Sequence, residues 1–125
     1  MKRSMMQIYV KNSAEAVAVY RKAFDAKLGY HVKNDDGSFY HSELDVYGQI
    51  LSVAESMDGS GGTTGSIMQF CLHFAKGEET ALLKAYDALK EGAEILHPMA
   101  ACEFAEAMSD LIDRFGVRWC LFLEG

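Results

Sequence analysis

Cysteines that could form structural bridges are scarce in this chain of 125 residues. Its three cysteines, Cys71, Cys102 and Cys120, lie far apart and form no CxxC pair. An odd number of separated cysteines builds neither a disulfide framework nor a zinc knuckle. The sequence therefore favours a reducing compartment, and we expect a cytoplasmic protein.

Basic residues are also few. Twelve lysines and arginines stand against eighteen acidic residues, which gives a net charge of −6, and the basic residues are scattered along the chain. This charge repels polyanions, so we expect neither nucleic acid nor an anionic membrane as a partner. No stretch approaches the roughly 18 apolar residues of a membrane-spanning helix. Gln7, Lys11 and Asn12 interrupt the apolar run that a signal peptide requires, so we expect no export.

Proline is almost absent, with Pro98 as the single residue, whereas 50% of the residues are hydrophobic and 24% are charged. This composition excludes a disordered or low-complexity chain. A chain of this length buries about two-thirds of its unfolded surface, which is enough for one hydrophobic core. We therefore expect a single domain that folds on its own.

The first half of the sequence predicts one helix among four strands. Asn12 followed by Glu15 resembles a capping box, and apolar residues then recur at helical spacing from Ser13 to Phe24. Short apolar or alternating runs, separated by turn residues such as Gly48, indicate strands. The predicted strands are Met5 to Val10, Leu28 to Val32, Phe39 to Val46 and Gln49 to Glu55.

The second half predicts a similar order after a glycine-rich stretch at 57–65. A helix is predicted from Glu78 to Glu91, with Leu82, Leu83, Tyr86 and Leu89 on its buried face and Gly92 at its end. Strands are predicted at Ile67 to Phe74, Ala93 to His97 and Val117 to Leu123. The segment Ala105 to Ile112 is ambiguous, because Met108 and Leu111 fit helical spacing as well as a strand.

The fold class that follows is α+β, with two βαβββ modules in one domain spanning 1–125. Module one is 1–56, the linker is 57–65 and module two is 66–125. Val17 and Tyr20 match Leu83 and Tyr86 at one constant offset, which gives the internal repeat thin support from residue identity. The modules are predicted to form a curled mixed sheet, with the helices on its outer face.

Alternation along the strands indicates which side chains share a face. One face of each strand is apolar and should receive the helices, so the mixed faces should line a cleft. We expect this cleft to bind a small molecule, although polar alternation is equally typical of a solvated sheet. The candidate ligand-binding residues are Tyr9, His41, Glu43, Gln69, His73, Arg118 and Cys120.

Four of these residues have specific alternatives. His41 and Glu43 are two apart on one strand, so they form either an acid/base pair or a solvated pair. Arg118 either binds an anionic or carbonyl ligand or makes an ion pair with Asp113 or Glu124. Cys120 is a reactive thiol if Arg118 lowers its pKa, and otherwise a small buried hydrophobic residue.

Four stretches resemble PhnB-like proteins of the glyoxalase/bleomycin-resistance/extradiol-dioxygenase superfamily, also called vicinal oxygen chelate proteins. They are Val10 to Phe24, Phe39 to Leu44, Leu89 to Ile95 and Asp113 to Trp119, and the last is the most specific. The resemblance covers essentially the whole chain. It implies two βαβββ modules around a cleft and a homodimer.

Metal-binding members of this superfamily have four ligands, on the first, fourth, fifth and eighth strands. The resemblance places these positions at Met5 or Gln7, Glu43, Gln69 and Cys120. Such a set lacks the imidazoles that usually anchor zinc, nickel or iron(II), so we expect no classical metal site and no cofactor.

The sequence thus favours a small-molecule-binding protein and leaves open whether it catalyses a reaction. One alternative is a metal-dependent lyase, isomerase or dioxygenase that uses Glu43 with His41 or His73. Another is a structural or interaction dimer with no ligand. Neither the ligand nor any catalytic residue can be named from the sequence.

Overall fold

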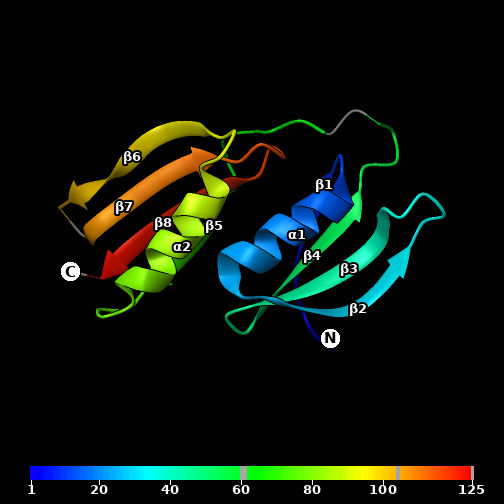
Figure 1. Cartoon of the computed structure of the whole chain (residues 1–125), viewed down its shortest axis with the longest axis horizontal. Helices are drawn as coiled ribbons and strands as arrows, with labels where there is room; N and C mark the ends of the chain where they lie inside the picture. Colours follow the sequence, from blue (N-terminus) through cyan, green and yellow to red (C-terminus); the bar gives the residue numbers. More distant parts are fainter. Residues whose placement is uncertain (60–61, 104, 125) are drawn as a thin grey trace. The chain divides into compact units, whose positions relative to one another are not determined.

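A computed structural model of the chain describes residues 1–59, 62–103 and 105–124. The chain divides into two compact units, Met1–Gly62 and Thr63–Gly125, and each has the element order βαβββ (Figure 1). Each unit contains one mixed four-stranded sheet and one helix. The predicted α+β class and its two βαβββ modules are therefore confirmed. Residues 60 and 61 of the predicted linker lie outside the described residues.

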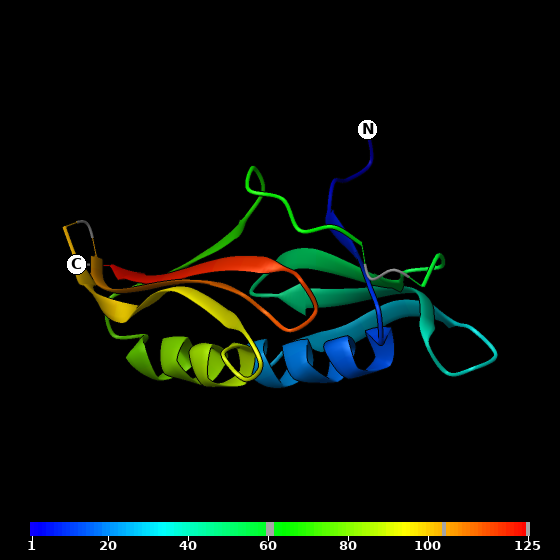
Figure 2. The same cartoon turned by 90° about the horizontal axis from the view of Figure 1, so that it is seen from above.

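The first unit is a mixed sheet with one covered face. Its elements are β1 (Met6–Val10), α1 (Ser13–Phe24), β2 (Lys27–Lys33), β3 (Phe39–Val46) and β4 (Gln49–Glu55). The strand order is β1-β4-β3-β2, in which β1 and β4 are parallel and the other pairs antiparallel. Helix α1 lies along one face (Figure 2). Tyr20 and Phe24 of this helix are buried with Leu44 and Val46 of β3, which fill the core by period-two alternation.

The start of α1 differs from the predicted capping box. Asn12 has a left-handed backbone, and its side chain makes no capping hydrogen bond. The carboxylate of Glu55, at the end of β4, instead accepts hydrogen bonds from the backbone N–H groups of Asn12 and Ser13, at 3.1 and 2.8 Å. The helix is thus capped by a residue 42 positions away from Ser13, which local spacing cannot reveal.

The second unit repeats the architecture. Its elements are β5 (Phe70–Phe74), α2 (Glu79–Leu89), β6 (Glu94–Cys102), β7 (Ala105–Ile112) and β8 (Arg118–Glu124). The strand order is β5-β8-β7-β6, with β5 and β8 parallel. Strand β6 continues through Pro98 beyond the predicted end at His97. It is an edge strand, and proline is tolerated in edge strands because they make ladder hydrogen bonds on one side only.

Three local features of this unit correct or complete the sequence predictions. Strand β5 begins at Phe70, so the predicted start at Ile67 is wrong. Leu83 is 49% exposed, and the buried face of α2 consists of Leu82, Ala85 and Leu89. The ambiguous segment is strand β7, which pairs with both β6 and β8. Pairing on two sides outweighs the helical spacing of its apolar residues.

No helix within the described residues is long and apolar enough to cross a membrane.

Candidate ligand-binding site

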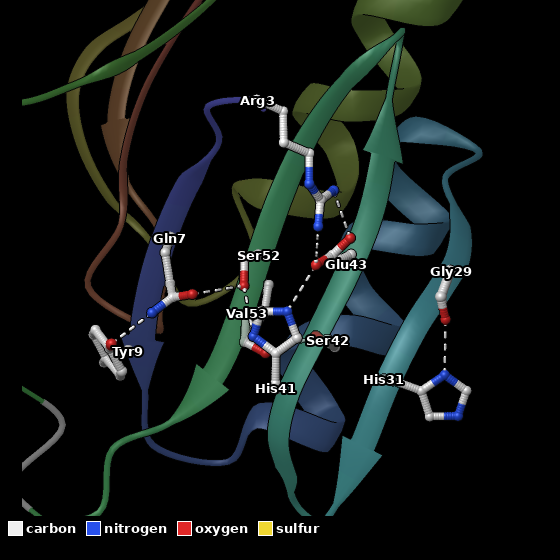
Figure 3. A network of polar contacts seen from close by, with 10 residues as sticks. All are labelled: Arg3, Gln7, Tyr9, Gly29, His31, His41, Ser42, Glu43, Ser52 and Val53. Carbon is white, nitrogen blue, oxygen red and sulfur yellow. Dashed lines mark hydrogen bonds and ion pairs between the residues drawn. The ribbon is translucent and has the colours of Figure 1, made fainter. Parts of the chain in front are cut away.

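A polar network occupies the face of the first sheet opposite α1 (Figure 3). Gln7 on β1, Ser52 on β4 and Glu43 on β3 lie in one row across the strands, because Ser52 is the register partner of both others. His41 lies two residues before Glu43 on the same strand. Backbone pairing thus fixes the spacing of these four side chains.

Glu43 is the centre of this network. Its carboxylate accepts two hydrogen bonds from the Arg3 guanidinium, Nη1 to Oε1 and Nη2 to Oε2, both at 2.9 Å. His41 Nε2 lies 2.8 Å from Oε2. The Glu43 side chain is only 9% exposed, whereas that of Arg3 is 48% exposed. The hydrogen bonds from Arg3 and then from His41 outweigh burial and lower the pKa of Glu43 to about 2.

The network continues from Ser52 towards β1. The Ser52 hydroxyl donates to Gln7 Oε1 at 3.1 Å and contacts His41 Nδ1 at 3.4 Å. Gln7 Nε2 in turn donates to the hydroxyl of Tyr9. Tyr9 is therefore the outer end of a chain of polar groups that begins at Glu43.

Three residues of this site, Ser52, Tyr30 and Arg3, were missed by sequence reasoning. Tyr30 on β2 is 67% exposed, and its ring centroid lies 5.9 Å from that of His41. Tyr30 lies on a predicted strand, but the register shift between Leu28 and His31 breaks the period-two alternation, so spacing alone could not place it beside His41. Arg3 has no sequence signal, because it precedes β1 and reaches a partner 40 residues away.

The second unit contains another ion pair between an arginine and a carboxylate. Arg118 on β8 donates from Nε and Nη2 to Asp110 of β7, at 3.1 and 2.8 Å. The expected partners Asp113 and Glu124 are therefore wrong. Gln69, just before β5, also donates to Asp110, at 2.9 Å. Asp110 was not predicted, since its strand was ambiguous in the sequence.

Cys120 is not the activated thiol that one reading of the sequence proposed. Arg118 is held by Asp110, and burial, followed by the neighbouring Cys71 thiol and Asp110 carboxylate, raises the pKa of Cys120 to about 11. Cys71 is the register partner of Cys120 on the adjacent parallel strand and is exposed. The alternative, a small and partly buried residue, describes Cys120 better.

His73 lies elsewhere on the second unit. Its ring stacks on Phe122 of β8, with centroids 4.5 Å apart. Both rings line a shallow hollow whose rim includes Glu103, Glu106 and Glu124. This surface combines an aromatic platform with carboxylates.

The seven predicted residues therefore fall into separate groups. Tyr9, His41 and Glu43 belong to one network in the first unit. Gln69 and Arg118 share Asp110 in the second unit, Cys120 lies beside Cys71, and His73 stacks on Phe122. A single cleft lined by all seven residues stays a prediction.

Comparison with known proteins rests on solved structures, since neither a protein-family model nor a curated protein matches the chain. A PhnB protein from Bacillus cereus, described as a putative 3-demethylubiquinone-9 3-methyltransferase, is 21% identical with a TM-score of 0.83, covering 98% of this chain and 99% of that one. Protein PA1353 from Pseudomonas aeruginosa is 18% identical with a TM-score of 0.81, covering 99% and 98%. The fosfomycin resistance protein FosX from Listeria monocytogenes is 13% identical with a TM-score of 0.73, covering 98% and 93%.

This chain has the vicinal oxygen chelate fold. The resemblance that the sequence predicted is thereby confirmed in the arrangement of strands and helices. Identities of 13 to 21% to these three structures make this a statement about fold and not about activity.

The metal-ligand positions of the vicinal oxygen chelate fold need one correction. Glu43 was expected on the fourth strand, but it lies on the third, β3, and β4 presents Ser52 at this level. In the second unit the corresponding row is Cys71, Cys120 and Asp110. Both carboxylates at the ends of these rows are paired with arginine, and the remaining donors are an amide, a hydroxyl and two thiols. This donor set does not fit the usual metal centre of the fold.

Within the described residues, no three histidine, cysteine or acidic side chains are grouped closely enough to hold a metal ion. The expectation that no metal binds stays a prediction, which the experiments below address.

Proposed function

We propose that this protein binds a small molecule on the polar face of its first sheet and uses no classical metal site. The observation that supports this most is the nearly buried Glu43 carboxylate, held by Arg3 and His41. The exposed ring of Tyr30 lies beside His41, and the exposed ring of Tyr9 lies at the end of the hydrogen-bond chain on β1. A few polar groups at fixed positions between aromatic walls are typical of ligand sites.

The pKa values of Glu43 and Cys120 fit a binding role better than a catalytic role. A general base works best when its pKa lies near the working pH, and the pKa of Glu43 is lowered to about 2. A nucleophilic cysteine needs a thiolate, and the pKa of Cys120 is raised to about 11. Neither group is tuned for proton transfer or nucleophilic attack near neutral pH.

The second candidate is a metal-dependent lyase, isomerase or dioxygenase. It is favoured by the adjacency of His41 Nε2 and Glu43 Oε2, at 2.8 Å on one strand face, since imidazole and carboxylate are both common metal ligands. Arg3 would have to leave Glu43 for an ion to bind there. A role for His73 with Glu43 would join residues of different units and rests on the sequence alone.

Metal titration separates these candidates. Metal-stripped protein is melted with zinc, nickel, manganese or iron(II), and we expect no specific shift in melting temperature. A shift of several degrees that disappears in Glu43→Ala, but persists in the exposed-carboxylate control Asp35→Ala, would establish the metal-dependent candidate instead.

A ligand panel tests the proposal itself. A small molecule at about 100 times its Kd stabilises the folded state by about 2.7 kcal/mol, which raises the melting temperature by several degrees. We expect a hit from a panel of metabolites and antibiotics to lose its effect in Glu43→Gln and to keep it in Asp35→Asn.

We also propose that the protein is a homodimer, as the superfamily resemblance implies, and that it is cytoplasmic, as its three separated cysteines favour. Sedimentation equilibrium measures the assembly directly. A dimer that responds to no member of the ligand panel would favour the structural or interaction role.

A further inference from the structure

The two units place a carboxylate at equivalent positions but pair it with arginine in different ways. Glu43 of β3 stands opposite Ser52 of β4, and Asp110 of β7 stands opposite Cys120 of β8. In the first unit β4 pairs in parallel with β1, and in the second β8 pairs in parallel with β5. Glu43 and Asp110 therefore correspond in strand and register.

The arginine on Asp110 is part of the sheet. Arg118 lies on β8 two residues before Cys120, so it shares a face with Cys120, and its backbone is the register partner of Ile112 on β7. The corresponding position on β4, two residues before Ser52, is Ile50. The first sheet has no arginine of its own at this place.

The arginine that pairs with Glu43 comes instead from outside the sheet. Arg3 belongs to residues 1–5, which have no helix or strand and precede β1. Figure 3 shows its side chain extending over β3 and β4 to Glu43. The carboxylate is fixed and 9% exposed, whereas the guanidinium side chain is 48% exposed on an unpaired segment. Holding a long, exposed side chain in one geometry costs conformational entropy, which offsets much of the electrostatic gain of such an ion pair.

We propose that Glu43 is the receptor for a guanidinium or amidinium group of a ligand, which takes the place of Arg3. This deepens the proposed function, since it names the ligand class of the same site. The Arg3 side chain shows the geometry of the bound group: two parallel N–H···O bonds of 2.9 Å to the two carboxylate oxygens. A planar, two-pronged cation satisfies both oxygens at once, whereas an ammonium group is a point charge.

The surroundings of Glu43 suit the rest of such a ligand. Tyr30 presents an exposed ring beside His41, and aromatic faces attract delocalised cations and flat groups. The net charge of −6 also attracts cations from solution. His41 remains on Oε2 when Arg3 leaves, so the carboxylate keeps its orientation.

Benzamidine and benzamide form a matched pair of probes, since they share the ring and differ in the amidinium charge. Binding to the intact chain is measured by NMR titration, following the ring protons of His41 and Tyr30. We expect benzamidine to bind and to shift both residues, and benzamide to bind at least tenfold more weakly. This comparison needs no variant and stands even if Glu43→Gln does not fold.

Competition with the N-terminal segment is the second part of the test. Arg3→Ala removes the internal competitor and should tighten benzamidine binding by about two- to fivefold, the range expected for a surface ion pair. Arg21→Ala removes an exposed arginine from α1, which covers the opposite face of the sheet. This control should leave the affinity for benzamidine unchanged. Glu43→Gln should abolish the difference between the two probes.

Equal binding of both probes, or unchanged affinity in Arg3→Ala, overturns the proposal. So does the absence of benzamidine binding in both the natural chain and Arg3→Ala. The wider proposal of small-molecule binding is tested separately by the ligand panel. A neutral or anionic hit that depends on Glu43 would support small-molecule binding and would refute only the cationic ligand class.

Discussion

Ser13 and Glu55 join the start of helix α1 to the end of strand β4. The carboxylate Oε1 of Glu55 accepts both the backbone N–H of Ser13, at 2.8 Å, and its hydroxyl, at 2.7 Å. The same hydroxyl oxygen accepts the backbone N–H of Phe39 at 2.8 Å, where β3 begins. Three elements of the first unit are thus held together at one buried serine.

Replacing Glu55 should uncap the helix. We expect Glu55→Ala to lower the free energy of unfolding by about 1–2 kcal/mol, since the first N–H groups of α1 lose their acceptor. Urea unfolding followed by circular dichroism measures this. Asn12→Gly is the matched control and should change stability by less than about 0.5 kcal/mol, because the Asn12 side chain makes no cap and glycine accepts a positive φ. A larger loss of stability in Asn12→Gly than in Glu55→Ala would show instead that Asn12 caps the helix, as the sequence predicted.

Glu43 should contribute stability that depends on pH. Its pKa falls from the ordinary 4.5 to about 2 in the folded protein. Because this pKa is lower in the folded protein than in the unfolded chain, the ionised Glu43 carboxylate stabilises the folded state fully above pH 4.5. This stabilisation is lost as the pH falls from 4.5 towards 2. The stability difference between the natural chain and Glu43→Gln should therefore shrink over that window in urea titrations. A difference that stays constant from pH 6 to pH 3 would show that Arg3 and His41 do not hold the carboxylate in solution.

Asp113 and Trp119 provide a test of buried hydrogen bonding in the second unit. The Trp119 indole N–H donates to Asp113 Oδ2 at 2.8 Å, and Oδ1 accepts the backbone N–H groups of Phe115 and Val117. Asp113→Asn should cost about 1–3 kcal/mol, because either the indole or the turn then meets an amide donor. Circular dichroism in urea gives the loss, and the double variant with Trp119→Phe should cost less than the sum of the two single changes. Strict additivity would mean that this bond contributes nothing.

The cysteines should react in a fixed order. Cys71 is exposed, whereas Cys120 is partly buried and has its pKa raised to about 11, so it is almost entirely protonated at pH 8. Iodoacetamide at pH 8 should alkylate Cys71 first, as read by peptide mass spectrometry. Cys71→Ser should leave Cys120 slow to react at pH 8, because burial, the largest cause of its raised pKa, remains. Rapid alkylation of Cys120 at pH 8 would support the alternative in which Arg118 activates it.

Local spacing in the sequence was sufficient for most elements of the fold. Helix α1 was predicted with its observed bounds, because its apolar residues recur every three to four positions. Strands β3 and β4 were also predicted with their observed bounds, since Gly48 has a φ of 90° and marks the turn between them. Strand β7 escaped this reasoning, because only its pairing on both sides decides between strand and helix.

The candidate site was predicted only in part for a related reason. Alternation placed His41 and Glu43 on one face, and the structure confirms their contact at 2.8 Å. The same reasoning did not find Arg3 as a partner of Glu43, and for Arg118 and the start of α1 it suggested partners other than the observed Asp110 and Glu55.

Apart from β7, the sequence alone determined the order of elements and which residues could share a face, because these follow from periods of two and 3.6 residues along the chain. The tertiary structure decided that Arg3 pairs with Glu43, Arg118 with Asp110 and Glu55 with Ser13. A charged or polar side chain takes whichever partner the strand pairing brings within reach. For Arg3 and Glu55 that partner is more than 39 residues away in the sequence, where no local pattern can identify it.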